Sequence, residues 1–526
     1  MNINNVFNIN FSGKVEDKKT SNARPYLAPQ KPDTFERTTA PKTAVKKDTV
    51  LDKISKMYNK MTPLKLDENG SKIISEDNLD ENKVMSLVKD IMTSKTSSVS
   101  FERAKCDGKE NYVLKTQNDD DTRNLKLLDK DLNVLEIEKT KVDYDKEGNP
   151  TAKTVMTNDL RTNTFCETKY DIGELRIPVM SSAVKIKRDA HNRLVRKETY
   201  EKSDVEGMFN VKYEFPNGKT RQISKATKDK KTGAVLIEKD MRSSDMTRTQ
   251  YRYEDDPNGN RIVDYKITDA NGKVLMNQSQ AFEVLGDNKF RSSRNNKSYL
   301  IELDDKSNTL KVTDEKKNEK TEIKLKDYVE GNDKKIANML KMIPGDELFN
   351  MKDNVLKIKE IEDKTKSYRA PEIDYGLDKP EMTEPALMYS SLAVSDDPFI
   401  FLHELGHAVD VGGKTFAMKR DDEGRLGLVV DGSIRDDKEF SKIYKEERKN
   451  FLKEFPTNER EHVRYFVNDE AVPRKPKSGI EETIAETNAL LNSYQSTDLV
   501  AIRTQYLQQH FPKSIAYLSE KLAPTK

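Results

Sequence analysis

The sequence predicts an α+β chain with a disordered N-terminal tail, an antiparallel meander of β-hairpins in the middle and a mainly helical domain at the C-terminus. Three observations predict this arrangement. The first residues show no periodic apolar face, the middle alternates short β-prone runs with turn residues, and apolar residues near the C-terminus recur at helical spacing. A length of 526 residues allows about three domains at roughly 150 residues each.

The N-terminal part should contribute little to a core. Residues 1–48 are rich in Lys, Thr, Pro, Asn and Ser, and we expect a disordered tail, either plain or with a short docking motif at residues 6–11. Residues 49–99 predict a short helical segment, because their apolar residues recur at helical spacing. The residues of this pattern are Val50, Ile54, Tyr58, Val84, Leu87, Val88 and Ile91.

Residues 100–330 predict a repeat-like array of antiparallel β-hairpins. β-prone runs such as Arg261–Thr268 partly alternate apolar and polar residues. Between the runs stand clusters of Asp, Asn and Gly, such as residues 145–149 and 256–260, which favour the left-handed and side-chain-bonded conformations of hairpin turns. The region resembles the tyrosine–aspartate hairpins of bacterial surface and toxin proteins. It is either a scaffold without chemistry or a surface that binds a partner.

The remaining chain is predicted to be helical. Residues 331–372 should form a helical connector, with a helix at residues 334–342 that stops before Pro344. Residues 373–526 should form a separate domain, and a fragment that begins near Ser367 is expected to fold by itself.

Composition excludes several classes of protein. The chain has 93 basic and 91 acidic residues, a balance that argues against a nucleic-acid-binding protein. The sequence contains no run of about 18 apolar residues, so it predicts no membrane-spanning segment. The N-terminus lacks the basic and apolar regions of a Sec signal peptide, so we expect a cytoplasmic protein or one secreted by a signal-independent route. Cys106 and Cys166 are too few for a disulfide scaffold.

One motif predicts chemistry, the sequence His403-Glu404-Leu405-Gly406-His407. Two imidazoles four residues apart lie on the same face of a helix, where both can bind one zinc ion. Glu404 stands beside the first histidine and can take a proton from a water molecule on the zinc. Asp397 as N-cap and Pro398 as first helical residue predict the start of this helix.

Two histidines do not complete a zinc site, and no third histidine follows His407 at a short spacing. A carboxylate from a second helix, predicted at residues 479–494, is the remaining candidate. Glu482 and Glu486 stand four residues apart on that helix, so one can bind the metal while the other supports a histidine. Without a metal, the same residues would be a hydrogen-bonded pair of core histidines and a solvated acidic helix face.

Together, the histidine motif and the later Glu482-Thr483-Ile484-Ala485-Glu486 resemble the catalytic domain of gluzincin metallopeptidases of the anthrax lethal-factor type, over about residues 370–526. The resemblance implies a zincin-like fold, Zn2+ as the cofactor, Glu482 as the third ligand and Glu486 as its support. It also implies an edge strand before the first motif that pairs with an extended substrate. Residues 384–394 are the candidate for this strand, and an ordinary core strand is the alternative.

The sequence departs from that family in two ways. The gap between His407 and Glu482 is longer, and no tyrosine directly precedes the second helix. Tyr465 is therefore the candidate for stabilising the oxyanion of the tetrahedral intermediate, and His462 is the alternative. Asp410 is expected either to support a ligand histidine or to end the helix.

These residues predict a zinc-dependent metalloendopeptidase acting on protein or peptide substrates, with Glu404 as general base. The alternative is a surface or binding protein in which the hairpin region binds a partner and the zinc module is not catalytic. Glu404 favours the enzyme, because it would bind no metal and has little structural reason to be present in a degenerate copy. A secreted effector, whose first part delivers the peptidase, is a further possibility. The oligomeric state is not predicted.

Overall fold

A computed structural model gives the fold of the chain in segments. The residues that it describes are 65–66, 82–83, 86–87, 89, 96–106, 109–118, 121–173, 178–304, 306–324, 329–330, 343–350, 356–360, 368–372, 389–394, 398–411, 416–420, 426–430, 432–455, 467, 478–493 and 501–522. The predicted tail with its possible docking motif, the predicted helix at residues 334–342, His462 and Tyr465 lie outside the described residues. The chain divides into one compact unit of residues 1–137 with 469–476 and a second of residues 138–468 with 477–526.

The first unit contains a small sheet. Strand β1 (Lys65–Leu66) pairs in parallel with β2 (Thr96–Cys106), which pairs with β3 (Lys109–Asn118), and β3 pairs with β4 (Arg123–Leu128), both antiparallel. Phe101 and Tyr112 stack in its core with their ring centroids 5.2 Å apart. The predicted helical segment of residues 49–99 thus contributes strand β1 and the start of β2, with helical conformation at residues 82–83, 86–87 and 89. Strand β5 (Val134–Tyr144) begins in this unit and ends in the second.

A long antiparallel sheet makes up most of the second unit. Each strand from β6 to β19 pairs with its neighbour in the sequence. These strands are β6 (Pro150–Asp159), β7 (Thr164–Ile172), β8 (Pro178–Arg188), β9 (Leu194–Lys202), β10 (Phe209–Glu214), β11 (Thr220–Lys228), β12 (Val235–Arg242), β13 (Arg248–Asp255), β14 (Arg261–Thr268), β15 (Val274–Gly286), β16 (Lys289–Arg294), β17 (Lys297–Asp304), β18 (Thr309–Asp314) and β19 (Lys320–Lys324).

One turn geometry recurs between these strands. In the turn after β5, Asp145 accepts hydrogen bonds from the backbone N–H groups of Glu147 and Asn149, at 2.9 and 2.8 Å. The fourth position has a left-handed backbone, where Gly148 has φ of 83° and Gly272 of a later turn has the same value. Asp supplies the bonds and Gly the conformation, which is why these clusters end one strand and begin the next.

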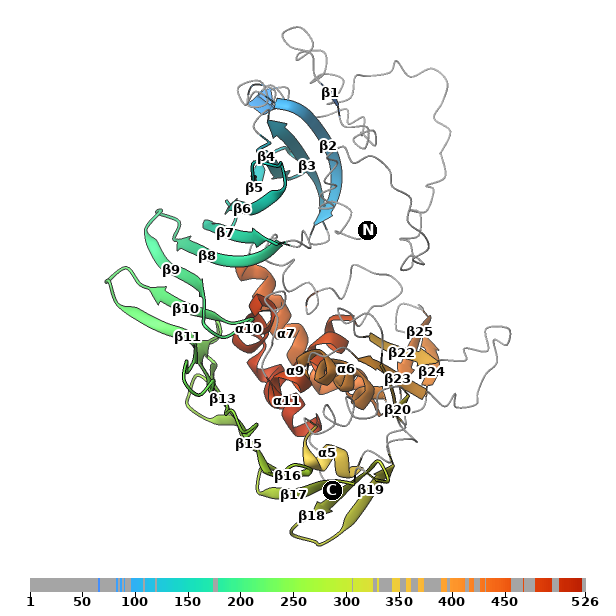
Figure 1. The fold of residues 1–526 in the computed structure, drawn as a ribbon. Coiled ribbons are helices and arrows are strands. Elements are labelled where there is room, and N and C mark those ends of the chain that lie inside the picture. The colour runs from blue at the N-terminus through green and yellow to red at the C-terminus, as the bar shows by residue number, and fades with distance from the viewer. Residues whose placement is uncertain are drawn as a thin grey trace. The chain divides into compact units, whose positions relative to one another are not determined.

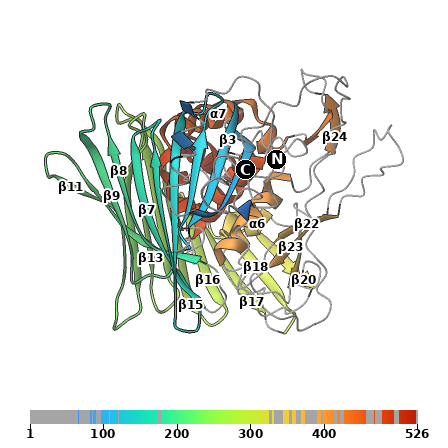
Figure 2. The same ribbon diagram turned by 90° about the horizontal axis from the view of Figure 1, so that it is seen from above.

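Several helices of the second unit cover one face of this sheet. The helices described in the unit are α5 (Gly345–Asn350), α6 (Pro398–Val411), η4 (Ile434–Asp436), α7 (Lys438–Glu454), α9 (Ser478–Asn492), α10 (Ala501–His510) and α11 (Pro512–Leu522). Figure 1 shows α10 and α11 beside the strands in the middle of the sheet, and Figure 2 shows these strands side by side with the helices on one face. Contacts join α9 to β14, α10 to β12 and β13, and α11 to β14 and β15.

The predicted fold class is therefore wrong. Antiparallel sheet dominates the residues that the structure describes, and the C-terminal helices do not form a mainly helical domain with a core of its own. One buried core joins Tyr253 and Tyr265 of the sheet to Leu507 and Ile515 of the helices. Helical periodicity shows that one face of a helix is buried but does not show against which element, so the sequence pattern did not reveal the sheet beneath the helices.

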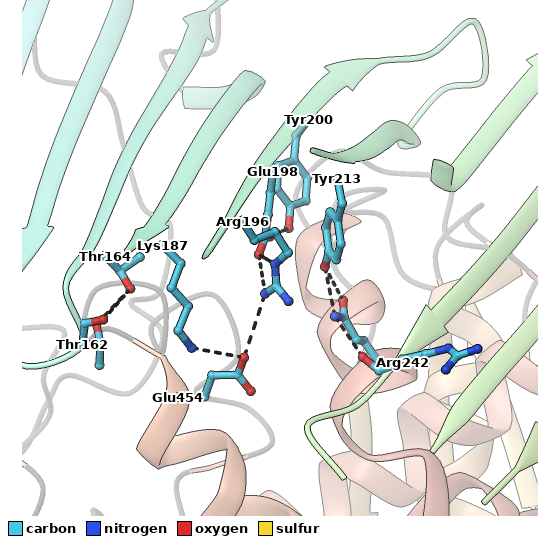
Figure 3. Close-up of polar contacts among 10 residues, drawn as sticks. Thr162, Thr164, Lys187, Arg196, Glu198, Tyr200, Tyr213, Arg242 and Glu454 are labelled. Carbon is cyan, nitrogen blue, oxygen red and sulfur yellow. Dashed lines mark hydrogen bonds and ion pairs between the residues drawn. The ribbon is translucent and has the colours of Figure 1, made fainter. Parts of the chain in front are cut away.

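Polar contacts also join the helices to the sheet. Tyr213 of β10 and Gln509 of α10 exchange hydrogen bonds, and Glu454 at the end of α7 pairs with Lys187 and Arg196 at 3.6 and 3.9 Å (Figure 3). Lys239 of β12 donates to the side chain of Gln508 at 2.6 Å. The interface between helices and sheet is therefore a mixture of apolar core and buried polar groups.

Two smaller sheets complete the second unit. The first has the order β20 (Val329–Glu330), β21 (Leu356–Glu360), β23 (Tyr389–Val394), β22 (Tyr368–Glu372). The predicted helical connector thus contributes helix α5 and strands β21 and β22. Strand β23 lies between β21 and β22, so it is the interior strand given as the alternative for residues 384–394, and the edge beside it is β22. The second small sheet pairs β24 (Phe416–Arg420) with β25 (Leu426–Val430).

Within the described segments, no helix is both long and apolar enough to cross a membrane. Cys166 is buried, and its Sγ atom lies 3.6 Å from the hydroxyl oxygen of Thr168.

Candidate metal centre

Helix α6 carries the histidine motif and is half embedded in the core. Phe399, Leu402 and Leu405 are at most 5% exposed and face inward. His403 is buried beside them, whereas Glu404 and His407 are half-buried. The apolar stripe thus fixes the rotation of the helix, and this rotation leaves one side of the motif open to a second helix.

Helix α9 crosses α6 at Gly406. A Cβ atom at position 406 would lie 2.7 Å from the Cα atom of Ala485 and 2.9 Å from the Cβ atom of Asn488. The Asn488 side chain donates to the backbone carbonyl of Leu402 at 2.8 Å. Only glycine allows the two backbones to approach this closely, so Gly406 sets the distance between the two helices.

The crossing brings together the three residues predicted as zinc ligands. Glu482 Oε2 lies 3.2 Å from His403 Nε2 and 3.5 Å from His407 Nε2. One donor atom from each residue falls within 4.8 Å of the others, and the two imidazole rings stand nearly perpendicular, at 87°. Bonds of about 2.1 Å to a tetrahedral zinc ion place neighbouring donor atoms about 3.4 Å apart, which fits these distances.

The carboxylate of Glu482 gives a further test of the fit. Its Oε2 atom is buried, yet it accepts no hydrogen bond of good geometry from the residues that the structure describes. A buried carboxylate oxygen without such a bond costs free energy unless a cation offsets its charge. The trio therefore fits a divalent metal ion, although a proton on His403 would offset the same charge.

Glu486, the second predicted carboxylate, supports His403 from behind. Its Oε2 atom lies 2.8 Å from His403 Nδ1, and its side chain is completely buried. Because a carboxylate only accepts hydrogen bonds, His403 Nδ1 carries the proton, and the Nε2 lone pair is left for a metal ion. The guanidinium of Arg503 in α10 donates to both oxygens of Glu486, each at 3.0 Å, and offsets the buried charge.

The carboxylates shift the titration of the site. Burial lowers the pKa of His403, but the contacts with Glu482 and Glu486 outweigh burial and raise this pKa to about 10. Burial raises the pKa of Glu482, but its contacts with His403 and His407 are stronger and lower it. Burial also raises the pKa of Glu486, and the charge of Arg503 reverses the shift. The two carboxylates thus favour a positive charge at His403, which a proton or a metal ion can supply.

Asp410, predicted to support a histidine or to end the helix, is buried one turn after His407. Its carboxylate accepts hydrogen bonds from the backbone N–H groups of Ile434 and Arg435, at 2.8 and 3.1 Å, and from Arg435 Nε. It therefore fixes the end of α6 to helix η4. The other predicted residues, Tyr465 and His462, are not among the described residues.

Two arginines of this region were not predicted from the sequence. Arg503 binds Glu486, and Arg435 binds Asp410 and Glu481. The only indication of these arginines in the sequence was that buried carboxylates on α9 require cationic partners. The sequence offers many lysines and arginines, and no spacing rule selects these two.

Comparison with known proteins adds no assignment. No protein-family model matches the sequence, and no curated protein is similar enough to it to count as a match. The site is therefore interpreted from its own geometry.

Proposed function

We propose that the chain is a zinc-dependent metalloendopeptidase that hydrolyses peptide bonds in protein or peptide substrates. The observation that carries this proposal is the meeting of His403, His407 and Glu482 at zinc-ligand spacing, with Glu404 on the same helix. Zinc held by these three side chains would polarise both a water molecule and the carbonyl of the substrate.

The residues of the chain divide the remaining work. Glu404 would accept the proton of the attacking water and pass it to the leaving amine, because its carboxylate is not required as a ligand once Glu482 fills the third position. Glu486, held by Arg503, keeps the proton of His403 on Nδ1. Three protein ligands leave the fourth position of a tetrahedral ion open, as catalytic zinc requires.

Strand β22 offers a place for an extended substrate. It is the edge of its sheet, it pairs with β23 alone among the described strands, and it contacts α6. Its residue Pro371 has no N–H group and is typical of an edge strand. A peptide that added to this edge would run beside the metal helix.

The deciding experiment compares the parent protein with Glu404→Gln, and uses Glu302→Gln on the exposed face of the sheet as the matched control. We expect all three proteins to bind one zinc ion. Glu404→Gln should hydrolyse a broad peptide library at least about a hundredfold more slowly, the lower end of what a positioned base contributes. Equal rates for the parent and Glu404→Gln would remove Glu404 from the mechanism.

The metal assignment has its own test. His403→Ala should lose stoichiometric zinc by elemental analysis, since it removes one of three ligands. If the parent binds zinc but hydrolyses nothing, the alternative of a binding protein with a non-catalytic zinc module replaces the enzyme.

A further inference from the structure

Helices α6 and α9 meet at the Gly406 crossing, where Asn488 donates to the Leu402 carbonyl and Glu486 bonds to His403. Contacts gathered around one crossing fix the distance between two helices more firmly than their rotation about that crossing. The ligands His403 and His407 stand on α6 and Glu482 on α9, so such a rotation would change the distances between donor atoms. A metal site tolerates displacements of only about 0.5 Å.

Arg435 of helix η4 provides a further attachment between the two helices. Its Nε atom donates to Asp410, one turn beyond His407 on α6, and its Nη1 atom donates to Glu481, the residue before the ligand Glu482 on α9. Both contacts are 2.5 Å long, and the Arg435 side chain is 8% exposed. One guanidinium therefore binds a carboxylate from each ligand helix. Asp410 stands one turn after His407, and Glu481 directly precedes Glu482.

Helix η4 is itself held firmly. Asp410 accepts two of its backbone N–H groups, and Ile434 is part of the buried core. Asp437, which follows η4, caps α7 by accepting from Glu439 and Phe440 and also accepts a hydrogen bond from Tyr517 of α11. Arg435 thus projects from a support that is anchored to two other helices.

We infer that Arg435 is a positioning residue that sets the rotation of α9 against α6 and so places Glu482 opposite His403 and His407. The inference rests on the proposed zinc site. Arginine is required because its planar fork can bond two carboxylates in different directions, whereas the lysine ammonium cannot reproduce that geometry. Arg435 touches neither the substrate nor the reacting atoms, and it acts through Glu482.

The test measures zinc affinity by competition with a chelator, and the visible spectrum of the cobalt-substituted protein, at a temperature where every variant is folded. Arg435→Gln should bind zinc at least several-fold more weakly, up to the about 10–100-fold that is typical when a group bonded directly to a ligand is lost. Glu481→Ala breaks the same link on the α9 side and should lose a similar factor. The double variant should lose little more, because both changes break one link.

Arg248→Gln is the matched control, because Arg248 binds Asp240 through two nitrogens on the exposed face of the sheet, and its zinc affinity should equal that of the parent. The cobalt spectrum should change in the Arg435 and Glu481 variants only, which a purely stabilising role would not produce.

Equal affinity and equal spectra for the parent, Arg435→Gln and Glu481→Ala would overturn this inference and leave the proposed function standing. Absence of zinc binding by the parent would overturn the proposed function as well. If Arg435→Gln does not fold, Glu481→Ala decides the matter.

Discussion

Gly406 shows how one missing side chain shapes the candidate site. A methyl group there would collide with the backbone of Ala485, so Gly406→Ala should push α9 away from α6. We expect the free energy of unfolding to fall by about 1–3 kcal/mol, the usual cost of overpacking, and zinc affinity to fall with it. Chemical denaturation and chelator competition would measure both effects.

Gly286 provides the control for this substitution. A Cβ atom at Gly286 would have no heavy atom within 4 Å, so Gly286→Ala should change neither stability nor zinc affinity appreciably. If Gly406→Ala binds zinc as tightly as Gly286→Ala does, the close crossing is not what places Glu482.

Lys239 predicts a dependence of stability on pH. Burial lowers its pKa to about 7, and its ammonium donates to the neutral side chain of Gln508 rather than to a carboxylate. The unfolded chain, in which the pKa is about 10.4, binds more protons than the folded protein between these two values. The free energy of unfolding should therefore rise with pH in this window, by up to about 1.4 kcal/mol per pH unit. Below about pH 7 both states carry the proton, so Lys239 no longer makes stability depend on pH.

Thermal unfolding of the parent and of Lys239→Met between about pH 6.5 and pH 9.5 would check this expectation. The midpoint temperature of unfolding of the parent should rise with pH relative to that of the variant. Parallel curves would mean that Lys239 keeps its ordinary pKa in the folded protein.

The sequence was most informative where a short spacing fixes a direction in space. His403 and His407, and likewise Glu482 and Glu486, share helix faces because helical geometry alone puts residues four apart on one side. Arg503 and Arg435 reach the site from other segments, and local spacing contains no information about such approaches. The same limit applies to the role of Asp410, whose partners lie on η4.

At the scale of the element, the recurring turn carries an unfavourable residue at Leu132, with φ of 61°, and at Met246, with φ of 67°. Met246 lies in the turn between β12 and β13 and is 50% exposed. An L-residue other than glycine costs about 1–2 kcal/mol in this conformation. Met246→Gly should therefore raise the free energy of unfolding by about 0.5–1 kcal/mol, after the entropy cost of glycine is subtracted.

The reverse change at an equivalent turn is the control. Gly272 has φ of 83° and open space around it, so Gly272→Ala should lower the free energy of unfolding through backbone strain alone. Urea denaturation of both variants and of the parent would measure the two changes in the free energy of unfolding. Destabilisation by Met246→Gly would show that the methionine side chain contributes contacts that outweigh the strain.

Turns could be read from the sequence because Asp145 bonds to backbone groups only two and four residues away. The order of strands in the sheet around β23 could not be read in this way. Strands β21, β22 and β23 are separated by long connections, and nothing local to residues 389–394 distinguishes an interior strand from an edge strand.

At the scale of the second unit, the shared core argues against the expectation that the C-terminal region folds alone. A fragment that begins near Ser367 would expose the faces of α9, α10 and α11 that the sheet covers. It would also lose the partners of Gln508 and Gln509 on the sheet. We expect such a fragment to be insoluble or to lack protected amide hydrogens.

Hydrogen exchange of the fragment, beside the intact chain, would test this prediction. A fragment that retains native protection in α9 and binds zinc would show that the helices are an independent domain after all, as the sequence alone predicted.

The distance along the chain between the sheet and its covering helices has a consequence for synthesis. Tyr213 and its partner Gln509 are 296 residues apart, an interval that takes about 15–60 seconds to translate at about 5–20 residues per second. Each hairpin needs only its neighbour, so the sheet can assemble on the ribosome while its inner face is still bare. Paired positions across that face include Lys239, Tyr251, Tyr265 and Gln278, whose polar atoms can bind water until the helices emerge. Polar groups whose burial costs free energy in the finished core would thus keep the nascent sheet soluble until the helices have been translated.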